Sequence, residues 1–187
     1  MKKIEDLLIK MGALMSGHFV LTSGLHSNQY IEKFRVLENP ESLDIICKEM
    51  SRYFNKEKID IVVGAAIGGI LLSLGVAREL GSKGVFAERI NGEMMFKRGF
   101  IIPEGSNIVI VEDIVTTGGS IKELITLLEQ KKVNIKGIIS LAHRGEEIDF
   151  GYKYRSLSNI EIETWAADNI PEWLDKIAVT KPGSTGK

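Results

Sequence analysis

The sequence predicts a doubly wound α/β fold, with a mainly parallel five-stranded sheet and helices on both faces. Short runs of continuous apolar and β-branched residues alternate along the chain with helix-like segments, which is typical of buried parallel strands. Hydrophobic residues make up 44% and charged residues 26% of the 187 residues, as in an ordinary globular domain. Two of the apolar runs end in glycine-rich turns that lead into a helix, and sheets of this class bind ligands at such turns.

The elements can be assigned in chain order from periodicity and turn residues. Residues 4–15 have helical spacing, and two short β-like stretches, GHFVLTSG and SNQYIEKF, follow them. A long helix starts after Asn39, because Pro40 is well tolerated in a first helical turn, and it reaches about Lys58. Further helices are predicted over 69–80 and 118–132, a hairpin or flexible flap over 91–106, and strands over 59–64, 83–88, 107–112, 135–143 and 160–165.

The length of the chain favours a single domain over residues 1–187. The α/β core is expected at about 40–165. Residues 1 to about 39, together with the C-terminal end, are expected to form a small N-terminal cap, or hood, over this core.

Charge and composition exclude several classes of protein. The net charge of −1 gives no general attraction to nucleic acid or anionic lipid. The single cysteine, Cys47, cannot form an internal disulfide, and the spacing of His18, His26 and His143 is not that of metal ligands. The apolar runs are too short to span a bilayer, and acids interrupt the apolar residues of the amino terminus, unlike a secretory signal. We therefore expect a cytoplasmic protein that binds neither nucleic acid nor membrane.

The string VIVEDIVTTGGS is the most informative motif in the chain. It places Glu112 and Asp113 at the end of an apolar strand, and residues 116–120 then run directly into a helix. Glycines let backbone N–H groups approach an anion, hydroxyls add donors, and a helix amino terminus favours negative charge. The acids would repel a phosphate that touched them, so they suit sugar hydroxyls or a cation. The alternative is an ordinary strand-to-helix turn with a hydroxyl cap and two solvated acids.

This string resembles the phosphoribosyl pyrophosphate (PRPP) signature of the type I phosphoribosyltransferases. It lacks the lysine of a P-loop and the GxGxxG of a dinucleotide-binding turn. Three other segments, HFVLTSGLHSNQYIE, GAAIGGILLSLGVARELG and LAHRGEE, resemble the members of that family that act on orotate. The resemblance implies a type I phosphoribosyltransferase-like fold. It also implies transfer of the 5-phosphoribosyl group from PRPP to orotate, giving orotidine 5-phosphate and pyrophosphate in pyrimidine biosynthesis.

The resemblance also implies roles for individual residues. Glu112 and Asp113 would hold the ribose hydroxyls, and the rest of the PRPP site would be Ile114, Val115, Thr116, Thr117, Gly118, Gly119, Ser120, Gly68 and Gly69. Orotate would contact Thr116, Arg144, Ser23, Gly24, Ser27 and Tyr30. Each assignment has a structural alternative. Arg144 could be a surface arginine paired with a nearby glutamate, the glycines could serve close helix–strand packing, and the segment around Ser23 could be a simple β-turn.

The predicted flap departs from the pattern of the family. Many relatives carry lysines and a histidine there, whereas this chain has Arg89, Lys97 and Arg98 and no histidine. A lysine that often precedes the cap serine is Thr22 here. Arg89, Lys97 and Arg98 are therefore predicted, with the acid pair, as catalytic residues that assist pyrophosphate departure, and the choice among the three stays open. A solvated hairpin tip is the alternative.

The resemblance further implies Mg²⁺, bound mainly through PRPP with no dedicated protein ligand, and a homodimer. Two other functions remain open. One is a phosphoribosyltransferase for another base, which should lack the serine-containing cap and the arginine after the fourth strand. The other is a regulator that senses PRPP, which should show a basic face or an added nucleic-acid-binding domain.

Overall fold

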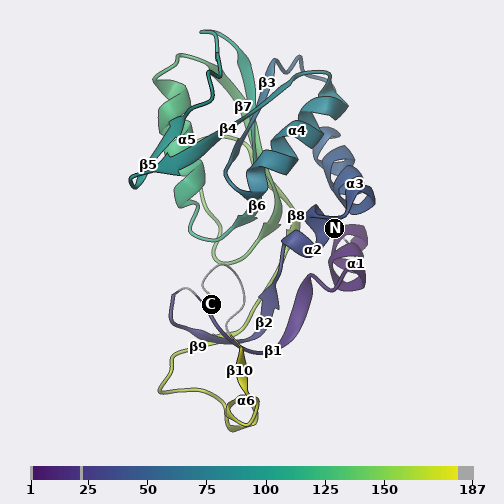
Figure 1. The fold of residues 1–187 in the computed structure, drawn as a ribbon, viewed down its shortest axis with the longest axis vertical. Helices are drawn as coiled ribbons and strands as arrows, with labels where there is room; N and C mark the ends of the chain where they lie inside the picture. The colour runs from purple at the N-terminus through teal and green to yellow at the C-terminus, as the bar shows by residue number, and fades with distance from the viewer. Residues whose placement is uncertain (1, 22, 181–187) are drawn as a thin grey trace.

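The computed structural model describes residues 2–21 and 23–180, and it contains two separate sheets (Figure 1). The larger sheet has six strands in the order β5-β4-β3-β6-β7-β8. Five of them run parallel: β3 (Ile61–Ala65), β4 (Lys83–Ile90), β6 (Asn107–Val115), β7 (Asn134–His143) and β8 (Tyr154–Asn159). The mainly parallel arrangement is as predicted, but the sheet has six strands and not five, and β8 is not one of the predicted strands. The sixth, β5 (Glu93–Phe96), pairs antiparallel with β4. The turn of this hairpin and its second strand lie within the segment 91–106 that was predicted as a hairpin or flap.

Helices cover both faces of this sheet, as predicted (Figure 1). On one face, α3 (Pro40–Ser51) and α4 (Gly68–Leu80) bury Ile46, Leu72 and Val76 in a cluster that α1 (Lys2–Lys10) joins. On the other face, α5 (Gly119–Glu129) buries Ile121, Leu124 and Leu128 against the strands. Because both faces are covered, β3 and most of β6 and β7 are buried, which explains their continuous apolar runs.

The helix ends follow local chemistry. Asn39 caps α3, since its side-chain Oδ1 accepts a hydrogen bond of 2.9 Å from the N–H of Ser42, and Pro40 is the first helical residue. The helix ends at Ser51, earlier than the predicted Lys58. Gly81 ends α4 in the left-handed conformation. The predicted first helix is also too long, because the chain turns after Lys10 and enters a strand at Leu14.

The smaller sheet has four strands in the order β10-β1-β2-β9. β1 (Leu14–Val20) and β2 (His26–Ile31) form a hairpin, and the short strands β9 (Thr164–Trp165) and β10 (Val179–Thr180) add to its two edges. We call this four-stranded sheet the hood. Two short helices accompany it: α2 (Phe34–Leu37) leads into the core, and α6 (Glu172–Asp175) precedes β10. The proposed division of the chain into cap and core, with its boundaries, stays a prediction.

The predicted strand over 160–165 is wrong. The parallel strand beside β7 is β8, at residues 154–159, and only Thr164–Trp165 is extended and paired, in the hood. An edge strand needs one apolar face, and β8 supplies it with Leu157, which is buried against the core. Glu161 and Glu163 belong to a segment that lines a cavity instead. Within the described part of the chain, no helix is both long and apolar enough to cross a membrane.

Candidate active site

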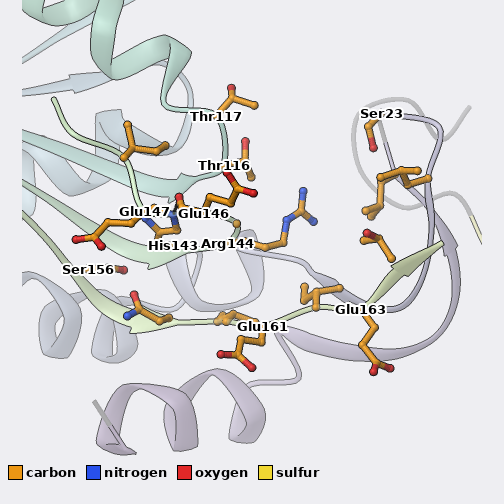
Figure 2. Close-up of a pocket in the computed structure, with 18 of the residues that line it drawn as sticks. Ser23, Thr116, Thr117, His143, Arg144, Glu146, Glu147, Ser156, Glu161 and Glu163 are labelled. Carbon is orange, nitrogen blue, oxygen red and sulfur yellow. Dashed lines mark hydrogen bonds between the residues drawn. The ribbon is translucent and has the colours of Figure 1, made fainter. Parts of the chain in front are cut away.

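The carboxyl ends of β6 and β7 face the hood across a cavity of about 1080 Å³ (Figure 2). The core contributes Thr116, Thr117 and Arg144 to its wall, and the hood contributes the turn that holds Ser23. Parallel sheets bind ligands at this edge because the strands end there and the chain turns away into loops and helices. The cavity therefore lies where the α/β topology favours a ligand.

Glu112 and Asp113 lie near the end of β6 and are 8% and 4% exposed. The Asp113 N–H donates to Oε1 of Glu112 at 3.0 Å, and Lys33 Nζ lies 2.7 Å from Oδ2 of Asp113. Burial, and then the charge of Asp113, raises the pKa of Glu112 to about 8, against the opposing effects of the Asp113 N–H and Lys33. The pair is thus held away from water, with one cation at its edge.

The turn after β6 encloses a second, smaller hollow of about 240 Å³. Residues 114–121 line it together with Arg89 and Glu112. Gly118 stands at the N-cap of α5 with φ +73°, and no side chain caps the helix there. A Cβ on Gly118 would lie 2.7 Å from the ring of Phe150, so both conformation and space require glycine. Uncapped N–H groups at a helix amino terminus beside a guanidinium can hold an anion.

The glycine turn between β3 and α4 lies against the acid pair. A Cβ on Gly68 would overlap Oδ2 of Asp113, and one on Gly64 would overlap the carbonyl of Gly69. These close approaches bring the backbone of the turn to the carboxylate. Close helix–strand packing therefore explains both Gly68 and Gly69, and a role for them in binding pyrophosphate stays a prediction.

Arg144 follows β7, and its N–H donates to the carbonyl of Val115 at 2.9 Å. Figure 2 shows its side chain reaching from the core toward the hood, where Ser23 lies. Burial lowers the pKa of Arg144, while its interaction with Tyr30 acts the other way. Burial, followed by Glu32, raises the pKa of Tyr30, so Tyr30 is a neutral phenol near this guanidinium. The core arginine and the hood tyrosine thus lie close enough to interact electrostatically.

The other predicted hood residues differ in their surroundings. Gly24 has φ +83°, and its N–H donates to the carbonyl of Leu21 at 2.9 Å, which makes the turn that presents Ser23. Ser27 is fully buried; its hydroxyl donates to the carbonyl of Glu163 at 2.9 Å and accepts from the N–H of Gln29. Thr22 and the KPGS segment lie outside the described residues. Binding by Ser23, Gly24, Ser27 and Tyr30 stays a prediction.

The three cations of the predicted flap also differ from one another. Arg89 donates to Oε1 of Glu123 at 2.9 Å and lines the smaller hollow. Arg98 forms two hydrogen bonds with Glu88, at 2.9 and 3.0 Å. Lys97 has no ion pair within residues 2–21 and 23–180. Of these three, Arg89 is the residue that the fold brings to the end of β6.

Sequence reasoning missed Lys33 as a neighbour of the acid pair. Lys33 lies in the segment SNQYIEKF, just after β2, and Asp113 lies 80 positions later in the core, so no local pattern indicates their contact. A partner for a buried carboxylate can be expected on general grounds, but its identity depends on the tertiary fold.

The fold, together with the two hollows at the ends of the parallel strands, can be compared with known families. Residues 35–175 match the family model described as "Phosphoribosyl transferase domain". An adenine phosphoribosyltransferase structure from Thermoanaerobacter pseudethanolicus superposes with a TM-score of 0.68, at 19% identity, over 84% of this chain and 99% of that chain. That similarity concerns the fold alone.

Two other relatives are more specific. The orotate phosphoribosyltransferase of Thermotoga maritima is 41% identical over 184 residues, which cover 98% of each chain. The crystal structure of orotate phosphoribosyltransferase from Aeropyrum pernix has a TM-score of 0.67 and 25% identity, over 83% of this chain and 93% of that chain. The chain therefore belongs to the phosphoribosyltransferase family and, within it, to the orotate phosphoribosyltransferases.

Proposed function

We propose that this protein transfers the 5-phosphoribosyl group of PRPP to orotate, giving orotidine 5-phosphate and pyrophosphate for pyrimidine biosynthesis. The observation that carries the proposal is the placement of three features around one sheet edge. A buried acid pair adjoins an uncapped helix start, and Arg144 projects into the cavity beside them. Family membership at about 40% identity over nearly the whole chain supports the same reaction.

The proposed roles follow from the chemistry of each group. Glu112 and Asp113 accept hydrogen bonds from the ribose hydroxyls, and residues 116–120 hold the 5-phosphate through backbone N–H groups and hydroxyls. Arg144 pairs with the planar carboxylate or carbonyl edge of orotate, because a guanidinium donates two parallel hydrogen bonds. Gly68 and Gly69 lie against the pyrophosphate. Arg89 lines the hollow proposed for the 5-phosphate, and the choice among Arg89, Lys97 and Arg98 as the cation that assists pyrophosphate departure stays open.

Catalysis then consists of positioning and fixed charge. Breaking the bond at C1 of the ribose builds positive charge on the ring and negative charge on the departing pyrophosphate. N1 of orotate takes the place of the pyrophosphate at C1, and no covalent bond to the protein is required. Holding PRPP and orotate in two adjoining hollows, both lined by Thr116 and Thr117, supplies the alignment, and cations beside the pyrophosphate stabilise the charge that develops there.

Magnesium fits this donor set. Glu112 and Asp113 offer oxygen ligands of the kind that Mg²⁺ prefers, while the described residues contain no group of three acidic, histidine or cysteine side chains able to form a complete cage. We therefore propose that Mg²⁺ is held mainly by PRPP oxygens and water beside the acid pair. When bound, it supplies positive charge to the pyrophosphate.

Activity with a panel of bases tests the proposal. Purified protein with PRPP and Mg²⁺ should consume orotate and leave adenine, hypoxanthine and uracil unreacted. Turnover of a purine in place of orotate would assign the chain to another base. Binding of PRPP without turnover of any base would favour a regulator.

We also propose a homodimer, as the family resemblance implies. Leu71 and Leu74 on α4, and Ile67 at its N-cap, are 37%, 66% and 72% exposed and stand at helical spacing along one side. Such a stripe of exposed apolar side chains favours contact with a second copy of the chain. The cytoplasmic location stays a prediction.

A further inference from the structure

A chain of hydrogen bonds joins β7 to β8 at the wall of the larger cavity, which His143 and Tyr154 themselves help to line. The hydroxyls of Ser140 and Tyr154 lie 2.9 Å apart, and the Tyr154 hydroxyl lies 2.9 Å from Nδ1 of His143. Nε2 of His143 lies 2.9 Å from the carbonyl oxygen of Glu146. Ser140 is fully buried and His143 nearly so. The reaction proposed above uses none of these three side chains.

The hydrogen bond between His143 and the Glu146 carbonyl determines which atom donates in each of the other hydrogen bonds. A backbone carbonyl can only accept, so Nε2 of His143 carries the hydrogen that bonds to Glu146. In the neutral imidazole Nδ1 is then an acceptor, and Tyr154 must donate to it. The oxygen of Tyr154 in turn accepts from Ser140. Burial raises the pKa of Tyr154, which keeps its hydroxyl protonated and able to donate.

The link from His143 to Glu146 closes a tight turn that contains Arg144 and Gly145 (Figure 2). The same turn is tied to the end of β6, because the Arg144 N–H donates to the carbonyl of Val115 at 2.9 Å. It also packs beside the phosphate turn, since a Cβ on Gly145 would lie 3.6 Å from the carbonyl of Thr116. Hydrogen bonds therefore join the backbone of this turn to the end of β6 and to the side chain of His143.

We infer that Ser140, Tyr154 and His143 are positioning residues, which fix the turn that aims Arg144 at the base and so set where orotate lies relative to the phosphoribosyl group. The inference rests on the proposed function and deepens it. Alignment of two reactants contributes much of the rate of a transfer reaction, so a small displacement of a base-binding arginine is costly. We call the three side chains the Ser140–Tyr154–His143 relay.

Substitution of Tyr154 is the direct test. Tyr154→Phe keeps the ring, which packs edge-on against Phe150 at 5.1 Å, and removes only the hydroxyl that joins the relay. Losing one buried hydrogen bond that orients Arg144 should raise the KM for orotate about 5- to 10-fold and leave the KM for PRPP within about twofold.

Tyr152→Phe is the matched control. It removes a phenol hydroxyl two positions away that donates to Glu129 on α5, outside the relay, and it should leave both KM values unchanged. An unchanged orotate KM in Tyr154→Phe would overturn the inference. So would equal rises in the KM for orotate and for PRPP, because a general loosening of the strands would affect both substrates.

Two variants at His143 provide a second route if Tyr154→Phe does not fold. His143→Leu removes both hydrogen bonds and should raise the orotate KM at least as much. His143→Gln retains an N–H of similar reach for the Glu146 carbonyl and should recover part of the loss. An orotate KM in His143→Gln no better than in His143→Leu would contradict a role for the turn-closing bond.

The tautomer of His143 can be measured without any turnover. In isotope-labelled protein, at a pH where the imidazole is neutral, nuclear magnetic resonance should show the proton of His143 on Nε2, assigned by the signal that His143→Gln removes. A proton on Nδ1 would overturn the relay. If the wild-type protein turned over no orotate, the proposed function would fail, and the tautomer would still decide whether the relay exists.

Discussion

At the scale of single residues, the burial of two adjoining carboxyl groups at the end of β6 disfavours the ionisation of Glu112. Glu112 is 8% exposed and adjoins Asp113, and its pKa is raised to about 8 from an ordinary 4.5. The folded protein therefore keeps a proton on Glu112 over a range of pH in which the unfolded chain has lost it. The free energy of unfolding due to Glu112 should fall as the pH rises from about 4.5 to about 8.

Glu112→Gln removes this ionisation while keeping the size of the side chain. Chemical denaturation should be compared near pH 5.5, which lies within this range, and near pH 8.5, which lies just above it. From the lower to the higher pH, the variant should lose less stability than the wild type. Equal losses in the two proteins would mean that Glu112 ionises normally in the fold.

At the scale of elements, the start of α4 is packed against the end of β6. Gly68 leaves no room for a side chain, because its Cβ would overlap Oδ2 of Asp113. In Gly68→Ala either the helix start or the carboxylate must move, so we expect the KM for PRPP to rise at least about tenfold and the stability to fall by about 1–3 kcal/mol.

Gly81→Ala, at the other end of the same helix, is the matched control. Gly81 has φ +64° and open space around its Cβ position, so alanine there should cost about 1 kcal/mol of stability through backbone strain alone. Its KM for PRPP should match that of the wild type. The KM for PRPP is measured by initial rates. Similar values in the two variants would show that Gly68 has no role in binding PRPP.

At the scale of the whole molecule, the exposed side of α4 bears on assembly. Sedimentation velocity should give a particle of twice the chain mass, and Leu74→Lys should shift it toward the monomer by placing a charge in the apolar stripe. Ile9→Lys is the control, because Ile9 is a comparably exposed apolar residue on α1, at 59% against 66% for Leu74. A wild-type monomer, or a dimer that Leu74→Lys leaves intact, would rule out this face.

The sequence by itself determined the features that depend on neighbouring residues. Continuous apolar runs predicted β3, β4, β6 and β7, and Asn39, Pro40 and Gly81 marked the helix ends, because strand burial and helix capping act over a few positions. The string VIVEDIVTTGGS indicated the acid pair and the turn for which we propose phosphate binding for the same reason: both lie within one strand–turn–helix unit.

Tertiary structure alone decided the contacts between distant segments. Lys33 meets Asp113, Tyr154 meets His143, and β9 and β10 join a sheet begun by β1 and β2. Tertiary structure also decided that residues 154–159, and not 160–165, form the strand beside β7. Both segments have strand-like patterns, and pairing with β7 selects between them. Local preferences differ by little at such positions, and the free energy of long-range packing determines which partner each segment takes.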